Sequence, residues 1–332
     1  MAKILISNSF PNQPILRQIP VRAASWCGHE FELSEADGPV DVWIVYDNLL
    51  EPKTVCCPRH RTMLITAEPP SIRRYRSAFT SQFGAVRTCH ETIQHRRIER
   101  SHEAQPWHYG LYPCRTHPQV LDYDTLASFK PPAKSKLLSV ISSNKIVTED
   151  HRQRLKFVGE LKAAFGDQVD VFGRGICDVA DKADAIWDYK YHIALENDHS
   201  QYYMSEKLLD GFLGWSFPFY SGGKYADSVL PRKSFARIDM YDPTQSIATI
   251  KKHIESGAYE SNLLEIGKAR SMVLDELNLF AVLCRSIDAM IQFDSQHFTQ
   301  SSDRMKRTTL LPKRKSMRLS VQQWMRAISL AA

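Results

Sequence analysis

The sequence predicts an α/β protein of two domains, each with a doubly wound parallel sheet, and a cleft between them. Short apolar runs typical of strands alternate with helix-sized segments in both halves of the chain, which is the pattern of parallel sheets. The 332 residues exceed what a single core usually holds. A proline-containing stretch without periodicity separates the halves. We therefore place the domains at 1–125 and 136–300, with a linker at 126–135 and a tail at 301–332.

The first half begins with a strand at 3–7, followed by stronger strands at 40–46 and 62–67. We expect helices between these strands. The third strand stops at Pro69 and Pro70, because proline lacks the N–H that a sheet ladder needs and holds the preceding residue extended. Glu68 therefore lies at the carboxyl end of that strand, facing whatever occupies the cleft.

The second half reads more regularly. A strand at 137–142 precedes a helix that Thr148 caps and Gly166 ends. Its apolar face recurs at helical spacing, as expected for a helix packed on a sheet. Further strands are predicted at 169–172, 191–195 and 217–220, with helices at 205–213 and from Asp242-Pro243 onward.

The charge of +6 belongs to the end of the chain. Residues 304–326 contain eight Lys or Arg and no acid, which leaves 35 basic and 37 acidic residues elsewhere. A body of this charge does not indicate a nucleic-acid partner. The seven cysteines are an odd number at irregular spacing, which favours a reducing compartment. With no long apolar run and no signal-peptide pattern at the start, we expect a cytoplasmic protein.

The same basic segment has an apolar side. Met317, Val321, Trp324 and Ile328 recur at the spacing of one helix face. A basic amphipathic helix can lie on an anionic bilayer, so residues 304–328 predict a peripheral contact with the inner membrane. A closing helix packed on the first domain, or a solvated tail, are the alternatives.

A candidate anion site lies where the strand at 191–195 leads through a polar loop into the helix at 205–213. Helix N-termini present unpaired backbone N–H groups and a positive partial charge, and Lys207 adds a full charge in the first turn. This arrangement at the carboxyl end of a strand indicates a site for a diphosphate or another anion.

The same region resembles the family-10 glycosyltransferases, the α1,3/4-fucosyltransferases. The matching segments follow the family's order, and they are Val169–Arg174, Tyr189–Asn197, Tyr203–Lys207, Pro218–Gly222 and Pro231–Phe235. The first half matches faintly, through Glu68-Pro69-Pro70, where the family usually has Glu-Ser-Pro, and through Tyr109-Gly110. The sequence departs from the family at Leu195, commonly Phe, and at Asp198, commonly Ser.

The resemblance implies a GT-B enzyme of two Rossmann-type domains that transfers fucose from GDP-fucose, with inversion, to a hydroxyl of a glycan acceptor. The first domain would hold the acceptor and the second the nucleotide. We expect an α1,3 linkage in surface polysaccharide or lipopolysaccharide synthesis. A different nucleotide-sugar donor, or a non-catalytic relative that binds a glycan or nucleotide, are the alternatives.

Displacement of GDP needs cations that stabilise the departing diphosphate. Lys207 meets this need, and the resemblance places Arg154 at a diphosphate-binding arginine. Read from spacing alone, Arg154 is a solvated charge on a helix face, and Lys207 could form a surface salt bridge. Two such cations can act without a metal, so no cofactor is required. Stimulation of the transfer by Mn²⁺ or Mg²⁺ is an alternative that the sequence does not exclude.

Four further residues complete the expected donor site. Glu206 can accept hydrogen bonds from ribose hydroxyls, although an acid in the first helical turn also stabilises the helix dipole. The resemblance implies that Asn197 and Tyr203 contact the ribose or the sugar, whereas an Asn after a strand is also a common turn former. Gly173 lets the backbone approach the nucleotide closely, or it serves only the turn.

Glu68 is the predicted catalytic base, because an inverting transfer needs a carboxylate on the side opposite the diphosphate. Burial on closure would raise its pKa toward the useful range. An ordinary loop acid is the other interpretation, and Glu91 or Glu103 would then replace it. His90, His95, His102 and His108 fit no zinc spacing and predict solvated loop histidines or acceptor contacts.

Overall fold

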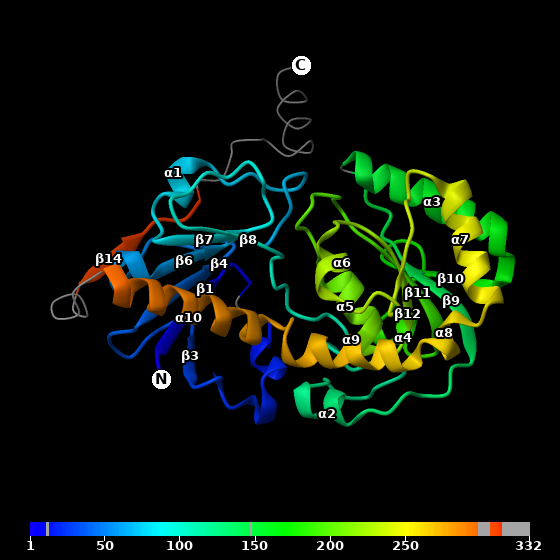
Figure 1. The fold of residues 1–332 in the computed structure, drawn as a ribbon, viewed down its shortest axis with the longest axis horizontal. Helices are drawn as coiled ribbons and strands as arrows, with labels where there is room; N and C mark the ends of the chain where they lie inside the picture. Colours follow the sequence, from blue (N-terminus) through cyan, green and yellow to red (C-terminus); the bar gives the residue numbers. More distant parts are fainter. Residues whose placement is uncertain (11–12, 147, 298–305, 314–332) are drawn as a thin grey trace, which may run out of the picture.

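The computed structural model describes residues 1–10, 13–146, 148–297 and 306–313. These residues form two α/β domains that lie next to each other (Figure 1). Each domain is built on its own predominantly parallel sheet, with seven strands in the first and five in the second. The predicted fold class is therefore confirmed.

The first sheet has the order β2-β3-β1-β4-β6-β7-β8, and only β2 and β3 pair antiparallel. Its strands are β1 (Lys3–Asn8), β2 (Ser25–Trp26), β3 (His29–Leu33), β4 (Val42–Tyr46), β6 (Thr62–Ile65), β7 (Ala85–Thr88) and β8 (Ile98–Arg100). Successive side chains of a strand point to opposite faces, and the central strands have apolar residues at successive positions, so both faces of the sheet are apolar. Ile4 and Ile6 face one core and Leu5 the other.

The expectation of helices between these strands is wrong. Within the described residues, the only α-helix between strands of this sheet is α1 (Ser77–Thr80), and the 3₁₀ turns are at Ile15–Gln18, Pro20–Arg22 and Arg59–Arg61. The cover for one face comes from the far end of the chain. Helix α10 (Leu279–His297) packs Phe280, Leu283 and Ile287 against the sheet. Residues 279–297 therefore belong to the first domain and not, as predicted, to the second.

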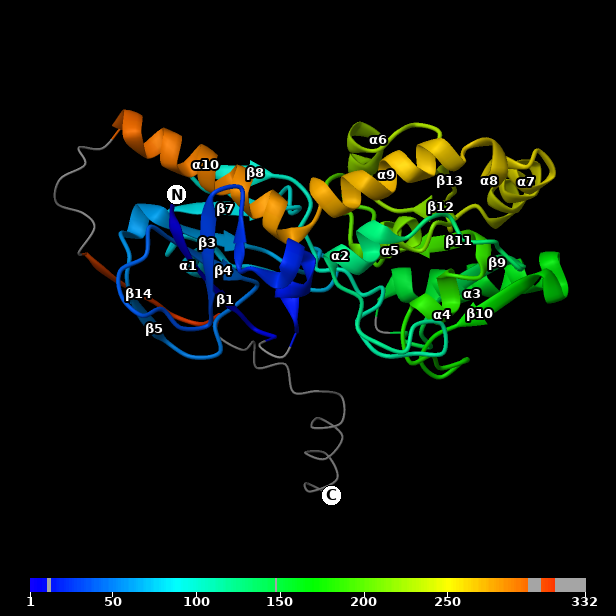
Figure 2. The same ribbon diagram turned by 90° about the horizontal axis from the view of Figure 1, so that it is seen from below.

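The opposite face of the first sheet also receives a late segment. Strand β14 (Arg307–Leu310) pairs antiparallel with β5 (Lys53–Cys56), and Leu310 is buried in that core with Val55. Figure 2 shows β14 beside β5. The predicted tail at 301–332 thus includes a strand of the first domain. Thr308 and Leu310 are buried and alternate with exposed Arg307 and Thr309, which is the period of a strand and not of the amphipathic helix predicted for the tail. The predicted membrane-facing helix at 317–328 lies outside the described residues.

The second sheet is entirely parallel, in the order β10-β9-β11-β12-β13. Its strands agree closely with the predicted ones, and they are β9 (Lys136–Ile141), β10 (Val169–Phe172), β11 (Tyr189–Leu195), β12 (Phe217–Ser221) and β13 (Ala236–Arg237). The surrounding helices are α3 (Glu149–Phe165), α4 (Ala183–Ile186), α5 (Glu206–Leu213), α6 (Tyr225–Val229), α7 (Pro243–Glu255), α8 (Ala258–Ser261) and α9 (Leu263–Asp275), and a 3₁₀ turn lies at Gly166–Gln168.

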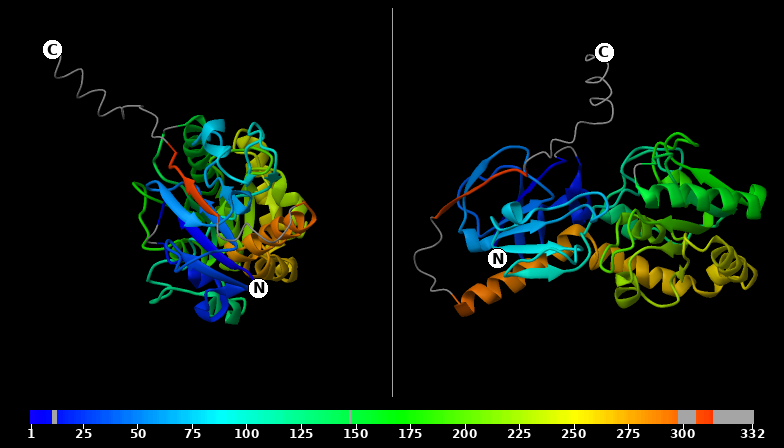
Figure 3. Two further views of the ribbon diagram at one scale, coloured as in Figure 1. Left: turned by 90° about the vertical axis from the view of Figure 1, so that its left-hand side faces the viewer. Right: turned by 90° about the horizontal axis from the view of Figure 1, so that it is seen from above.

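The chain crosses between the domains earlier than predicted. Trp107, Tyr109 and Leu121 are buried in the core of the second domain, together with Leu126 of helix α2 (Tyr123–Ser128). The predicted boundary at residue 125 therefore lies too late. A second crossing follows α9, which leads into α10 along one side of both domains (Figures 2 and 3).

Arg17 of the first domain holds residues 107–121, the segment that crosses to the second domain, in place. It is buried, and its guanidinium donates to the carbonyl oxygens of Trp107 (2.5 Å), Tyr109 (3.2 Å) and Leu121 (2.6 Å). Each carbonyl would otherwise be an unsatisfied acceptor away from water. The contact fixes where the first domain meets the second.

Candidate donor site

A cavity of about 440 Å³ opens in the second domain beyond the carboxyl ends of β9 and β11. This is the edge at which parallel α/β sheets bind their ligands. The charged and polar side chains that line it come from several helices, strand ends and loops, and they are His108, Ser143, Lys145, His151, Arg154, Arg174, Lys182, His192, Asn197, Glu206, Lys207 and Asp210. Cations outnumber carboxylates here, so the cavity favours an anion.

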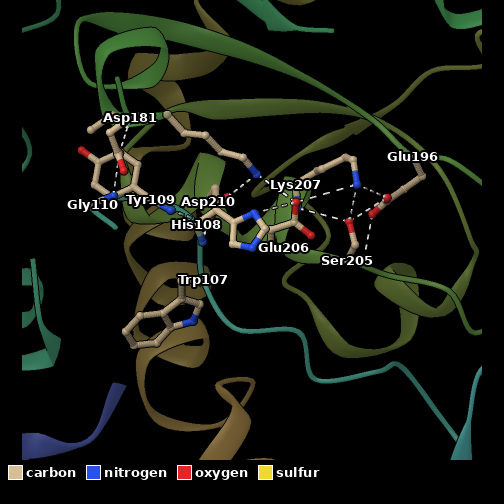
Figure 4. Close-up of polar contacts among 12 residues, drawn as sticks. Trp107, His108, Tyr109, Gly110, Asp181, Glu196, Ser205, Glu206, Lys207 and Asp210 are labelled. Atoms are coloured by element: carbon tan, nitrogen blue, oxygen red, sulfur yellow. Dashed lines mark hydrogen bonds and ion pairs between the residues drawn. The ribbon is translucent and has the colours of Figure 1, made fainter. Parts of the chain in front are cut away.

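Lys207 lies in the first turn of α5, as predicted. The N-cap Ser205 accepts from the Lys207 backbone N–H (3.3 Å) and from its Nζ (3.0 Å), and donates to Glu196 Oε2 (2.7 Å). The Lys207 ammonium also lies 3.4 Å from Glu196 Oε2. Figure 4 shows these groups in one line of contacts. With 22% of its side chain exposed, Lys207 is no surface salt bridge; it lies at the cavity wall.

Glu206 belongs to a buried cluster of charges (Figure 4). Its Oε1 lies 2.9 Å from Lys182 Nζ and 3.5 Å from His108 Nδ1, and Lys182 also lies 2.7 Å from Asp210 Oδ2. Burial opposes ionisation of Glu206, but the charges of Lys182 and Lys207 outweigh it and hold its pKa well below the usual range. Burial lowers the pKa of His108, which keeps its imidazole neutral near pH 7.

Asp210 ties this cluster to the crossing segment. One carboxylate oxygen accepts from the backbone N–H groups of His108 and Tyr109, both at 3.1 Å. Asp181 does the same for Gly110 N–H at 2.8 Å. The backbone of the crossing segment is thereby held against the donor cavity, with the His108 side chain on the cavity wall.

Arg154 does not behave as a solvated helix charge. It is 5% exposed, and one of its guanidinium nitrogens donates to Asn197 Oδ1 at 2.6 Å. Its Nε is buried with no hydrogen-bond partner among the described residues. Exposed Arg152 on the same helix pairs with Glu149 instead. The structure thus brings Arg154 and Asn197 together on the cavity wall, with donor capacity left over.

Two predicted donor residues lie outside the cavity lining. Gly173 has φ +128°, and a Cβ there would meet the Ser142 carbonyl oxygen at 2.2 Å, so its close approach is to the backbone after β9. Tyr203 is 1% exposed, and its backbone carbonyl accepts from Tyr220 Oη at 3.4 Å. Both positions support the loops around the cavity in this structure.

Glu68 lies at the carboxyl end of β6 and faces the second domain, as predicted. The residue is half-buried, and burial raises its pKa, with a smaller opposing effect from Arg73 and contributions from Lys207 and Glu206 across the domain junction. Among the described residues no donor to its carboxylate is recorded. Its backbone carbonyl accepts from His90 Nε2 at 2.8 Å, so this histidine orients the loop.

The two alternative acids are placed differently. Glu103 is fully buried beside the Cys89 thiol, which closes it off from an acceptor, and burial raises its pKa well above the usual range. Exposed Glu91 accepts from Gln201 N–H of the second domain at 3.3 Å. The histidine expectation is wrong for His90 and His102, which are 2% and 1% exposed.

Sequence reasoning missed Lys182, Asp210, His108 and Glu196 as parts of the site. Glu196 lies within the family-like segment Tyr189–Asn197, and His108 was one of four histidines expected in solvated loops or at the acceptor, but neither spacing nor residue type placed them in the donor site. Lys182 meets Glu206 only through the fold, across 24 residues. Burial of Glu196 inside an apolar strand end was the one available signal, since buried carboxylates need partners.

The described residues offer neither a metal site nor a membrane-spanning helix. They contain no group of three or more His, Cys, Asp or Glu side chains placed to hold a metal ion. No helix within those residues has the length and apolar character needed to cross a bilayer. A separate cavity of about 470 Å³ in the first domain, lined by Arg59, Ser81, Gln94, His95 and Arg96, contains none of the predicted site residues.

Residues 131–261 match the family model described as glycosyltransferase family 10 (fucosyltransferase), C-terminal part. These residues include every residue that lines the cavity except His108, with both Arg154 and Lys207, and all five resembling segments. The second domain is a family-10 glycosyltransferase domain. The family match therefore covers the domain that carries the candidate donor site.

Curated fucosyltransferases are similar to part of the chain. The 4-galactosyl-N-acetylglucosaminide 3-alpha-L-fucosyltransferase 9 of Homo sapiens is 26% identical over 152 residues, and that of Cricetulus griseus is 24% identical over 152 residues. Each match covers 44% of this chain and 39% of the relative. The chain thus matches about two fifths of the length of these relatives.

Likeness in structure extends beyond the family-10 domain to the whole chain. A crystal structure of an alpha1,3-fucosyltransferase aligns with a TM-score of 0.53 and 18% identity, over 90% of this chain and 91% of that one. The crystal structure of alpha1,3-fucosyltransferase with GDP-fucose gives 0.53 and 18%, over 91% and 92%. These alignments confirm the GT-B arrangement of two Rossmann-like domains.

Proposed function

We propose that the protein transfers fucose from GDP-fucose to a hydroxyl of a glycan acceptor, with inversion at the anomeric carbon. The observation that carries the proposal is the pairing of two kinds of group across the domain junction. Arg154, Lys207 and Glu206 line the cavity of the family-10 domain, and the charges of Lys207 and Glu206 reach the carboxylate of Glu68 in the first domain.

The donor diphosphate would bind Arg154 and Lys207. Arg154 has an unpartnered buried Nε, and Lys207 lies at a helix N-terminus whose backbone N–H groups favour anions. Charge-assisted bonds of this kind stabilise the negative charge that develops on GDP as it leaves. Ionised Glu206 would accept from ribose hydroxyls, and Lys182 keeps it ionised. Asn197 completes this side of the site on the cavity wall, while buried Tyr203 supports the loop around it.

The reaction needs one proton transfer and one displacement. Glu68 would take the proton of the acceptor hydroxyl as the acceptor oxygen attacks the anomeric carbon from the side opposite the diphosphate. The bond between that carbon and the diphosphate oxygen breaks, and GDP departs with the electron pair. Arg154 and Lys207 would supply the positive charge at the leaving group, so we propose transfer without a required metal ion.

The acceptor proposal rests on the relatives. Their name describes transfer to the 3-position of an N-acetylglucosaminide that carries galactose. We propose an α1,3 linkage here as well, within surface polysaccharide or lipopolysaccharide synthesis at the inner membrane. Residues 314–328, the part of the basic segment beyond β14 and Lys313, would bring the enzyme to an anionic membrane surface.

One assay tests the proposal directly. Purified protein is incubated with GDP-fucose, GDP-mannose or UDP-galactose and a panel of acceptors that includes N-acetyllactosamine, with and without EDTA. We expect GDP release and a fucosylated product only with GDP-fucose, unaffected by EDTA. Turnover of GDP-mannose or UDP-galactose instead would favour a different nucleotide-sugar donor. GDP binding without turnover of any of the three donors would favour a non-catalytic relative.

A further inference from the structure

The end of the described chain lies at the proposed acceptor side of the cleft. Strand β5 leads away from the carboxyl edge of the first sheet, and β14 runs antiparallel to it, so β14 returns the chain to that edge. Lys313 backbone N–H then donates to Asn48 Oδ1 at 2.7 Å, directly after β4. Figure 1 shows the chain after β14 ending beside α1.

Lys313 is half-buried at this edge, and no carboxylate of the described residues forms an ion pair with it. Its ammonium lies 4.8 Å from the centre of the Tyr75 ring, a cation–π contact. No ion pair of Lys313 is recorded among the described residues. Burial lowers the pKa of Lys313, and the nearby charges of Arg73 and Arg76 lower it further, with Asp47 opposing them. The protein thus holds three cations close together at one place.

The carboxylates nearby compensate only part of this charge. Buried Asp47 accepts from Arg73, Ser9 Oγ (2.7 Å) and Tyr75 Oη (2.5 Å), which occupies its oxygens. Exposed Arg76 has no recorded carboxylate partner in the described part of the chain. Holding unpaired cations together at a partly buried site costs free energy, which a bound anion would relieve.

The cations are close to the proposed base. Tyr75 Oη accepts from Ala67 N–H at 3.2 Å, directly before Glu68. The Tyr75 ring also packs edge-on against His90 at 5.2 Å, and His90 donates to the Glu68 carbonyl. Tyr75 therefore contacts both the Lys313 ammonium and the loop that carries Glu68.

We propose that Lys313, Arg73 and Arg76 form an acceptor subsite for the carboxylate of an acidic sugar, one that neighbours the sugar receiving fucose. The subsite rests on the proposed function, because it places the bound carboxylate beside the acceptor hydroxyl at Glu68. Lys313 would recognise the carboxylate as a point charge, and Arg76 would add a second contact at the rim.

Methyl β-glucuronide and methyl β-glucoside are matched probes, since only the glucuronide carries a carboxylate. Their binding is measured by saturation-transfer NMR at low salt with GDP present, on the wild-type protein and on Lys313→Met and Arg76→Met. We expect the wild type to bind the glucuronide better, and Lys313→Met to weaken that binding by about fivefold, as for an exposed charge contact. The glucoside signal should not change.

Arg307→Met is the matched control, because Arg307 is exposed at the other end of β14 and its removal changes the net charge equally. Equal binding of the two sugars, or equal weakening in Lys313→Met and Arg307→Met, overturns the subsite. Thermal melts verify that each variant is folded. Calorimetry with GDP on the same samples separates the outcomes, since loss of GDP binding would count against the proposed function and not against the subsite.

Discussion

The backbone N–H of Ser71 donates to the carboxylate of Asp198 across the domain junction, at 3.1 Å. Ser71 Oγ also donates to the carbonyl oxygen of Asn197 at 3.2 Å. Ser71 follows Glu68-Pro69-Pro70, and Asp198 follows β11, so this contact fixes the loop of the proposed base against the donor cavity. Asp198 is one of the two positions that depart from the common family residue.

Replacing Asp198 by Ala should therefore loosen the Glu68 loop. A hydrogen bond to a charged group contributes about 1.5–3 kcal/mol, and less where water competes. We expect the rate of transfer to fall and the affinity for GDP to stay unchanged, because Asp198 does not line the cavity. Calorimetry and initial rates check this, and unchanged rates would show that Ser71 does not position the base.

Asp198 also predicts a pH dependence of stability. Burial disfavours its charged form, but hydrogen bonds from Ser200 and Ser71 outweigh burial and lower the pKa. A lowered pKa stabilises the fold above the unfolded value of about 3.9, and this stabilisation is lost as the pH falls through the folded value. Urea midpoints of Asp198→Asn should fall less steeply below pH 5 than those of the wild type.

Arg154→Ala and Lys207→Ala should each weaken donor binding or the transition state by about 1.5–3 kcal/mol, the range for a charged hydrogen bond. The reason is the loss of a cation that would hold the diphosphate. Arg152→Ala is the matched control, because Arg152 lies on the same helix, is exposed and pairs with Glu149. GDP affinities and rates that match the control in both variants would contradict the diphosphate assignment.

Glu68→Gln should keep GDP affinity and reduce transfer by about 10² to 10⁴-fold, the usual share of general-base catalysis. Because burial raises the pKa of Glu68, the rate should rise with pH through a value above that of a free glutamate. Glu91→Gln is the comparison variant. Near-normal turnover in Glu68→Gln together with a loss in Glu91→Gln would move the base to Glu91, since buried Glu103 is closed off.

Lys182→Met should destabilise the second domain by about 3–5 kcal/mol, because it leaves the Glu206 and Asp210 carboxylates buried without their cation. Urea unfolding measures this. The control Lys190→Met removes an exposed partner of Glu260 and should cost less than about 1 kcal/mol. Equal losses in both variants would show that the buried cluster does not depend on Lys182.

Truncation after Lys313 should leave activity on soluble acceptors intact and release the protein from anionic vesicles. Truncation after Asp303 also removes β14, whose buried Leu310 contributes about 1.5–3 kcal/mol, so that variant should melt earlier. Co-sedimentation with anionic and neutral vesicles checks the first expectation. Unchanged co-sedimentation would show that residues 314–332 do not anchor the protein.

The strands and helices of the second domain could be predicted from local sequence. Its strands at 137–142 and 169–172 are apolar runs bounded by caps and glycines, so propensity, pattern and turn residues all predict the observed elements. The environment of Arg154 could not be predicted in this way, because the sequence around a helical arginine is the same whether its side chain faces water or a cavity. Only the packing of α3 on the sheet decided that its guanidinium reaches Asn197.

The sequence by itself determined most strands of the second domain, the helix start at Lys207 and the strand-end position of Glu68, because each depends on neighbours within a few residues. The tertiary structure alone decided that α10 and β14 complete the first domain, and that Lys182 joins Glu206 and Asp210. An amphipathic helix or a short strand can pack on any apolar face of suitable shape, and a lysine can pair with any carboxylate. Which of them meet is fixed by the three-dimensional path of the chain, which local spacing does not encode.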